Sequence, residues 1–322
     1  MLIKSIQVKD LDVSPEIKRI LVTGGSGQVG SAIKLLKNKD KYHFLFPSSN
    51  EFDITKSRKM SNYLDKKNID MIINLAAYTK VDRAEVAMKQ SSEVNNRGVY
   101  LLASKAINRN IELIHFSTDY VFGKGKNHIR KENEKKSPIN FYGLTKSLGE
   151  DYVVSSENNY LIIRIASVFG IQGDNFIKTM IRHLLEKEEI RVISDQKISM
   201  TSSFDVAKNI FKIIKLYHRN SAQKKSKKII HFTNKGYTNW YSVAKIVKDE
   251  MEKVLSMKIN SKLIPIKSNE WVSKAKRPKD SRLKVDFKYL ESANIDLPHW
   301  EESVRYTVKS VVKKEANYFA RK

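Results

Sequence analysis

The chain has 322 residues, 41% of them hydrophobic, and a formal net charge of +25. This composition excludes an intrinsically disordered chain, and the absence of cysteine excludes disulfides and cysteine-based metal sites. No uncharged apolar run approaches the roughly 18 residues of a membrane span, and no signal peptide is recognisable. We therefore expect a cytoplasmic protein without a membrane partner.

The positive charge is spread along the chain, and its densest run lies at residues 224–228. No nucleic-acid motif accompanies that run, so we predict no nucleic-acid partner. Two explanations stay open: the lysines reflect a compositional bias on solvated faces, or they attract anionic small molecules such as nucleotide sugars and NADP. The seven histidines show no metal-ligand spacing, and we predict no protein metal site.

A glycine-rich turn follows the first predicted strand, residues 20–22, and leads into a helical pattern. Gly24, Gly27 and Gly30 are spaced as G-x-x-G-x-x-G, and the same stretch fits G-x-G-x-x-G when it is counted from Gly25. Such glycines allow a tight turn and let backbone N–H groups approach a pyrophosphate at the start of a helix. The order strand, turn, helix predicts a dinucleotide site for NADP(H) or NAD(H). Its predicted cofactor-binding residues are Gly24, Gly27, Gln28, Val29 and Gly30.

The second predicted strand, residues 42–46, ends in a segment without a carboxylate, residues 47–50. An acidic residue near this place often binds the adenosine ribose, so its absence permits a 2′-phosphate and therefore NADP. Asp53 and Ile54 are predicted to line the adenine pocket, and the alternative for Asp53 is a turn residue or a helix cap.

A third buried strand, residues 71–75, runs into Ala76, Ala77 and Tyr78. We expect the small residues of this segment to let the cofactor lie close above the strand end. Asn95 follows on a predicted helix. It is either a solvated polar residue or a buried amide that braces the catalytic strand.

Thr118 follows the next strand, residues 113–116, and its hydroxyl is expected in the crevice at the carboxyl end of the sheet. Tyr142 and Lys146 open a later helix and share one face because they are four residues apart. Tyr-x-x-x-Lys occurs five times in the chain, so the spacing alone decides nothing. Only this copy opens a helix downstream of both the glycine turn and a strand-end hydroxyl. We therefore predict that Thr118, Tyr142 and Lys146 are catalytic and that Tyr142 and Lys146 also bind the cofactor.

Strands and helices alternate up to residue 170, which predicts an α/β fold with a Rossmann-like doubly wound parallel sheet. The pattern then lapses, which indicates a smaller C-terminal α/β substrate domain. A helix is expected over residues 205–217. The predicted parts are an N-terminal extension (1–17), an NAD(P)-binding domain (18–170) completed by a returning segment (200–235), and a substrate domain (171–199 and 236–322).

Five motifs of the first half occur together: the glycine turn at 23–30, Asn-Leu-Ala-Ala-Tyr-Thr at 74–79, Val-Asp-Arg-Ala-Glu at 81–85, Ser-Thr-Asp-Tyr-Val-Phe at 117–122 and Tyr-Gly-Leu-Thr-Lys at 142–146. Further matches follow at 173–180, 195–196, 201–202, 236–241 and 275–283. This combination resembles the dTDP-4-dehydrorhamnose reductases, a branch of the extended short-chain dehydrogenases. The resemblance covers nearly the whole chain from about residue 19.

The resemblance implies NAD(P)H-dependent reduction of the keto group of a nucleotide-linked 4-keto-6-deoxy sugar, a step toward surface polysaccharide precursors. Tyr142 would donate a proton as general acid, and Lys146 would lower the tyrosine pKa from its ordinary value of about 10. Thr118 would bind the substrate carbonyl. Asn175 and Arg277 would bind the diphosphate of a nucleotide-diphosphate sugar, with a surface role as the alternative for Arg277. The oligomeric state stays open, with a homodimer among the outcomes.

Two segments depart from the family pattern. Residues 165–167 are Ile-Ala-Ser where an aromatic residue is usual, and residues 195–201 lack the usual glycine and proline. These departures favour a relative that acts on a different sugar or has weakened activity. Two other classes stay open, a non-catalytic NADP-binding regulatory subunit and a nucleotide-sugar epimerase, which would retain NAD.

Overall fold

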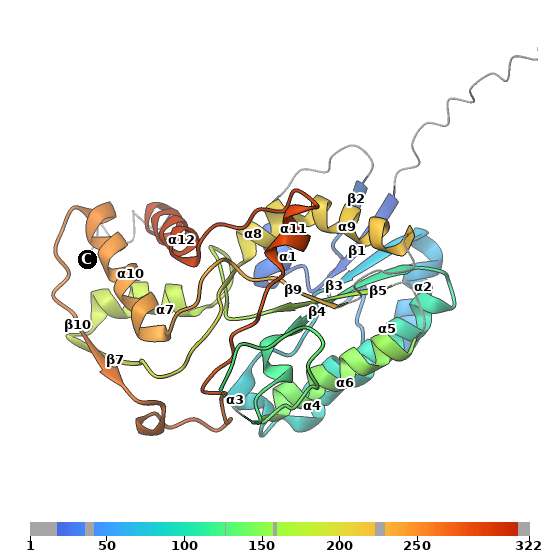
Figure 1. Cartoon of the computed structure of the whole chain (residues 1–322). Coiled ribbons are helices and arrows are strands. Elements are labelled where there is room, and N and C mark those ends of the chain that lie inside the picture. The colour runs from blue at the N-terminus through green and yellow to red at the C-terminus, as the bar shows by residue number, and fades with distance from the viewer. Residues whose placement is uncertain (1–17, 36–41, 126, 157–159, 223–228, 315–322) are drawn as a thin grey trace, which may run out of the picture.

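A six-stranded parallel sheet lies at the centre of the molecule, in a computed structural model that describes residues 18–35, 42–125, 127–156, 160–222 and 229–314 (Figure 1). The predicted N-terminal extension, residues 1–17, lies outside the described residues. The strand order is β2-β1-β3-β4-β5-β9. The strands are β1 (Lys18–Thr23), β2 (Tyr42–Leu45), β3 (Met71–Asn74), β4 (Glu112–Thr118), β5 (Tyr160–Ile165) and β9 (Ile229–His231).

Helices cover both faces of this sheet (Figure 1), as the prediction of a doubly wound fold requires. Side chains of β1 alternate between the faces: Ile20 and Val22 join one apolar core, and Leu21 joins the other. One face carries α1 (Gln28–Lys34), α8 (Ser203–Lys208), α9 (Ile210–Ala222) and α11 (Phe287–Glu291). The other carries α2 (Ser57–Lys67), α5 (Gly98–Ile107) and α6 (Phe141–Ser155). The predicted α/β fold class is confirmed.

The strand order reverses at β1. From β1 the chain runs outward to β2, then crosses back so that β3 pairs with the other edge of β1. Ligands of such sheets bind at the carboxyl ends of the two strands that flank the reversal. Here those ends are Thr23 and Asn74, which are paired in register.

A second apolar core lies beyond the sheet, on the left of Figure 1. It is built by α7 (Phe176–Glu186), α10 (Trp240–Leu255) and α12 (Trp300–Lys314) around the parallel pair β7 (Glu189–Ile193) and β10 (Lys262–Ile266). Two short strands, β6 (Val168–Phe169) and β8 (Thr201–Ser202), pair between the two parts. β9 comes from the segment predicted to return to the sheet, whereas the division into domains stays a prediction.

The helix expected over residues 205–217 is two helices, so that prediction is wrong at Asn209. The break has a local cause: the Asn209 side chain donates to the Asp205 backbone oxygen at 2.9 Å and competes with the helix ladder. Other short elements connect the layers: α3 (Val81–Ala84), α4 (Met88–Ser92), the π-helix η1 (Glu93–Arg97), and the 3₁₀-helices η2 (Asp119–Val121) and η3 (Ser268–Glu270). Within the described ranges, no helix combines the length and apolar composition that crossing a membrane requires.

A buried ion pair holds α6 against β5. Arg164 donates to both carboxylate oxygens of Glu150, at 2.9 and 2.8 Å, and both side chains are almost fully buried. The Arg164 guanidinium also lies 5.0 Å from the Phe122 ring centroid. Because each buried charge is neutralised by the other, removing one partner leaves the other charge buried and uncompensated.

We therefore predict that Glu150→Gln lowers the free energy of unfolding by about 3–5 kcal/mol, measured by urea denaturation. The matched control is Glu93→Gln, which removes the exposed Glu93–Arg97 pair and is expected to cost less than about 1 kcal/mol. Equal losses in the two variants would contradict the structural importance of the buried pair.

Candidate active site

The glycine turn brings β1 and β3 into close contact. Gly24 has a φ of +65°, and a Cβ there would lie 2.7 Å from the backbone of Leu75 and Ala76. Only glycine combines this conformation with this approach. Gly27 precedes the first helical residue, Gln28, and no side chain caps the helix. The first backbone N–H groups of α1 can therefore face a pyrophosphate, so this turn fits the predicted dinucleotide. Val29 and Gly30 are buried below it.

The Thr23 hydroxyl joins the ends of β1 and β3. It donates to Asn74 Oδ1 at 2.6 Å and accepts from the backbone nitrogens of Leu75 and Ala76 at 3.2 Å each. These contacts hold the start of the segment Ala76–Tyr78, which leads away from β3 along the crevice. The segment predicted to lie beneath a cofactor is thus fixed by a side chain below it.

Asn95 fixes the far end of the same segment. Its amide accepts from the Tyr78 nitrogen at 2.8 Å and donates to the Tyr78 oxygen at 3.0 Å and to Thr145 Oγ1 at 3.2 Å. Asn95 is fully buried, which confirms the prediction of a buried amide. Its hydrogen bonds brace the segment after β3 and α6 rather than β4, the strand that ends in Thr118. The Tyr78 hydroxyl is buried without a hydrogen-bond partner among the described residues.

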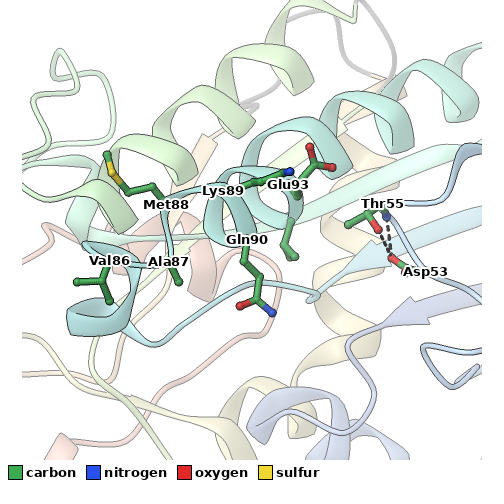
Figure 2. A pocket seen from close by; sticks show the side chains of 9 residues that line it. Asp53, Thr55, Val86, Ala87, Met88, Lys89, Gln90 and Glu93 are labelled. Atoms are coloured by element: carbon green, nitrogen blue, oxygen red, sulfur yellow. Dashed lines mark hydrogen bonds between the residues drawn. The ribbon is translucent and has the colours of Figure 1, made fainter.

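Asp53 lines a cavity of about 580 Å³ with Thr55 and residues 86–90, 93 and 94 (Figure 2). Asp53 Oδ1 accepts from the backbone nitrogen and the hydroxyl of Thr55, at 2.8 Å each. This is the turn geometry given above as the alternative for Asp53, and it leaves the second carboxylate oxygen for another partner. Ile54 is buried and packs against Gly98. Their predicted role in adenine binding stays a prediction.

The loop after β2 contains an acidic residue, Glu51, that the sequence reasoning missed. Glu51 folds back and accepts from the Ser48 nitrogen at 2.8 Å and the Ser48 hydroxyl at 2.9 Å. These bonds hold the pKa of Glu51 below its ordinary value. Residues 47–50 lack a carboxylate, yet the loop contains one, because a turn brings Glu51 back over it.

Thr118 and Tyr142 meet at the carboxyl end of β4. The Thr118 hydroxyl donates to Asp119 Oδ1 at 2.9 Å and accepts from the Tyr120 nitrogen at 3.2 Å. Tyr142 lies in the first turn of α6, where Asn140 caps the helix by accepting from the Gly143 nitrogen at 2.7 Å. The structure brings these predicted catalytic residues together, and the sequence reasoning missed Asp119 although it belongs to the motif at 117–122.

Burial dominates the electrostatics of this pair. It raises the pKa of Tyr142 above the ordinary tyrosine value, and the hydrogen bond with Thr118 opposes it. The direction is opposite to the lowering that we expected from Lys146. Burial also raises the pKa of Asp119 to about 6, against hydrogen bonds from Ser281 and Thr118. Tyr142 is therefore protonated near neutral pH, as a proton donor must be.

Lys146 lies one turn after Tyr142 and is almost fully buried. Its Nζ donates to the Phe116 backbone oxygen at 2.7 Å and lies 3.4 Å from His115 Nε2. Burial lowers the pKa of Lys146 to about 8, and Glu150 opposes that shift. The sequence reasoning missed His115. Its signal was an imidazole within the otherwise apolar run of residues 113–116.

The two predicted diphosphate ligands have protein partners. Asn175 caps α7 by accepting from the Lys178 nitrogen at 3.2 Å, and it donates to Gln28 Oε1 at 3.0 Å. Arg277 donates to Asp82 Oδ2 at 2.6 Å, and this contact holds the pKa of Asp82 well below its usual range. Asn175 thus touches the glycine turn, whereas the positive charge of Arg277 is partly neutralised by Asp82. Their roles in substrate binding stay predictions.

In the part of the chain that the structure describes, no three His, Asp or Glu side chains come together as metal ligands. The site combines two hydroxyl groups, those of Thr118 and Tyr142, at the same edge of the sheet as the glycine turn. A buried lysine lies one helical turn away. This arrangement suits proton transfer to an oxygen held next to a bound dinucleotide.

Residues 18–313 match the family model described as RmlD substrate binding domain. The chain is 34% identical over 291 residues to the dTDP-4-dehydrorhamnose reductase of Aggregatibacter actinomycetemcomitans, which covers 89% of this chain and 97% of the relative. It is 31% identical over 229 residues to the dTDP-4-keto-6-deoxy-D-glucose reductase of Streptomyces niveus, covering 71% and 77% of the two chains.

A solved structure agrees with these matches. The dTDP-4-dehydrorhamnose reductase of Bacillus anthracis in complex with NADP superposes with a TM-score of 0.79 at 31% identity, covering 90% of this chain and 98% of that chain. The family model spans nearly all of the described chain, and these relatives exceed 30% identity over most of their length. The glycine turn and the Thr118–Tyr142 pair lie within the matched region. The chain therefore belongs to the dTDP-4-dehydrorhamnose reductase family.

Proposed function

We propose that this protein reduces the 4-keto group of a dTDP-linked 6-deoxy sugar with NADPH as the reductant. The observation that carries the proposal is the buried Thr118–Tyr142 pair at the carboxyl end of β4, at the same edge of the sheet as the glycine turn. The relatives named above support the reaction and the nucleotide, and the NADP complex of the Bacillus anthracis enzyme supports the cofactor.

Each group of the site has a role in this reaction. NADPH, when bound by the glycine turn and the segment Ala76–Tyr78, supplies hydride to the carbonyl carbon. Tyr142 donates its phenolic proton to the carbonyl oxygen, so that the ketone becomes an alcohol. Thr118 holds the same oxygen in place. Lys146 stabilises the tyrosinate that is left behind, because a positive charge one turn away favours the anion.

The identity of the sugar on the dTDP-linked substrate is the part of the specificity that stays open. The Streptomyces niveus relative is named for a dTDP-4-keto-6-deoxy-D-glucose substrate, whereas the others are named for dehydrorhamnose. Ser167, which stands where the family usually has an aromatic side chain, has a φ of +41° between β5 and β6. A small residue there leaves more room beside the sugar, which supports a substrate or stereochemistry different from that of the rhamnose precursor.

A reductase is favoured over the two alternative classes. A cofactor-binding regulatory subunit does not need a proton donor with a matching hydroxyl, and the relatives named above are reductases. An epimerase would keep its oxidised cofactor through purification. The cofactor content of the purified protein and its turnover therefore separate the three classes.

We predict that the protein oxidises NADPH, or NADH in a parallel assay, only when a dTDP-4-keto-6-deoxy sugar is present, measured by loss of reduced-nicotinamide absorbance. Tyr142→Phe removes the proton donor and is expected to lower kcat by roughly 10²–10⁴-fold. The matched control is Tyr63→Phe, since Tyr63 and Lys67 repeat the same spacing on α2. Cofactor binding without turnover of any such sugar would favour the regulatory subunit.

Asp119 gives a pH-dependent prediction. Its folded-state pKa of about 6 exceeds the ordinary 3.8, so the folded protein disfavours the carboxylate, and stability is lost as the pH rises through 6. Asp119→Asn removes this penalty. We expect the stability advantage of the variant over the wild type to grow by about 1 kcal/mol from pH 5 to pH 8 in urea denaturation. An advantage that is equal at both pH values would contradict the raised pKa.

We also propose a homodimer through α5 and α6, which lie side by side in Figure 1. Leu144, Leu148 and Tyr152 are 37–42% exposed and recur every four residues along α6. Tyr100 on α5 extends the stripe, with its ring centroid 5.0 Å from that of Tyr152. A second copy of the same stripe would bury this apolar surface, as isologous dimers do.

Leu148→Glu is expected to shift the protein from dimer to monomer in sedimentation experiments, because a charge at the centre of an apolar interface stays unpaired. Val272→Glu is the control, since Val272 is also apolar and exposed but lies outside the stripe. A monomeric wild type at all concentrations would contradict the proposed dimer.

A further inference from the structure

A buried chain of polar side chains runs from the glycine turn to the catalytic lysine. It connects Thr23 on β1, Asn74 on β3, His115 on β4 and Lys146 on α6. None of these side chains is more than 3% exposed. Buried polar groups are costly unless every donor meets an acceptor, so the directions of the hydrogen bonds along such a chain are constrained.

The backbone sets the direction at the first step. Thr23 Oγ1 accepts from the backbone nitrogens of Leu75 and Ala76, which uses both of its lone pairs. Its one proton must then point to its remaining neighbour, the side chain of Asn74, at 2.6 Å. The Asn74 atom at that position is therefore the oxygen, because an amide NH₂ cannot accept.

The direction then passes to the imidazole. With its oxygen toward Thr23, Asn74 presents Nδ2 to His115 Nδ1, at 2.9 Å. His115 Nδ1 must accept this bond and carries no proton. Burial, together with the positive charges of Lys146 and Lys136, holds the pKa of His115 well below its ordinary value, so the ring is neutral. The single proton of a neutral ring that lacks one at Nδ1 lies on Nε2.

The Nε2–H group faces Lys146 Nζ at 3.4 Å. An ammonium group there would set donor against donor, whereas a neutral amine would accept the bond with its lone pair. In both states Lys146 can still donate to the Phe116 oxygen at 2.7 Å. The hydrogen-bond directions along this series of side chains thus disfavour the charged form of Lys146. This effect adds to the cost of burying the charge.

Other charged groups around Lys146 also affect its protonation. Glu150, on the same helix, favours the ammonium form, but it is shared with Arg164 of β5 and with Lys136, whose Nζ lies 3.6 Å from it. Asp119 of η2 acts on Tyr142, which shares this face of α6 with Lys146 and Glu150. From the central sheet, the titratable side chain of His115 lies 3.4 Å from Nζ, beside the Phe116 backbone oxygen.

We propose that His115 is a positioning residue whose Nε2–H tautomer, imposed by Thr23 and Asn74, holds Lys146 as a readily released proton source for Tyr142. An ammonium group that is disfavoured by its surroundings is a stronger acid. Lys146 therefore returns a proton to the tyrosinate after Tyr142 has given its own to the substrate oxygen. The role in turnover rests on the proposed reductase reaction, whereas the tautomer and its effect on Lys146 do not.

The test is ¹⁵N NMR of histidine-labelled protein, which needs no turnover. His115 is assigned from the signal that is lost in His115→Gln. We expect an Nε2–H tautomer at pH 7 and a second change of its Nε2 shift near pH 8, where Lys146 titrates. Lys146→Met is expected to remove that second change and keep the tautomer. An Nδ1–H tautomer, or an imidazolium at pH 7, would overturn the proposal.

Asn74→Asp reverses the hydrogen bond between residue 74 and His115, because a carboxylate accepts from both Thr23 and His115. We expect the Nδ1–H tautomer and a rise of the Lys146 midpoint by at least about one pH unit, since Nε2 then accepts from the ammonium. Thr23→Val frees Asn74 to flip, and the matched Thr23→Ser keeps the hydroxyl and is expected to keep the wild-type spectrum.

The kinetic readout is the pH profile of kcat. In Asn74→Asp its alkaline limb is expected to move in parallel with the NMR midpoint, with kcat at pH 7 lowered about tenfold. A changed tautomer with an unchanged Lys146 midpoint would overturn the link between His115 and the lysine. A shifted midpoint in a protein that reduces no dTDP sugar would overturn the proposed function and the role in turnover, while leaving the tautomer effect standing.

Discussion

The contact between the ends of β1 and β3 is the constraint on which the site depends. Gly24 takes a positive φ so that its backbone can lie against Leu75 and Ala76, and the Thr23 hydroxyl then binds the amides of both residues. Without this contact the glycine turn and the segment Ala76–Tyr78 would not share one crevice. In sheets of this kind the crevice opens where the strand order reverses, which here is between the carboxyl ends of β1 and β3. The contact between these ends holds the glycine turn on one side of the crevice and the segment Ala76–Tyr78 on the other.

α6 carries Tyr142 and Lys146, and buried hydrogen bonds fix the helix at several points along its length. The Asn140 cap fixes its first turn, Asn95 binds Thr145 in its second turn, and Glu150 anchors its second half to Arg164 on β5. Each of these groups is buried, so each bond is made in a medium where an unmade bond is costly. Tyr142 therefore meets Thr118 with little freedom to move, which favours proton transfer over a short path.

The sequence predicted the features that are encoded locally. Gly24 and its neighbours and the apolar strands depend on short patterns and their order, whereas the choice of Tyr142 among five similar pairs stays a prediction. The break at Asn209, the return of Glu51 over Ser48 and the direction of the Tyr142 pKa depend on folded surroundings. The contact of His115 with Lys146 joins residues 31 apart, and a pattern of residue types cannot place two such atoms.

The sheet has a consequence for how the protein is made. β9, its last strand, pairs with β5 through Ile162, Ile163 and Arg164, although about sixty residues, among them α7 and β7 of the second apolar core, are synthesised between them. A nascent chain that has just left the ribosome with β5 in place presents that strand as an uncovered edge, open to pairing with another chain. Translation must reach His231 before the edge is closed, so slow synthesis or truncation within this interval favours aggregation over a half-built enzyme.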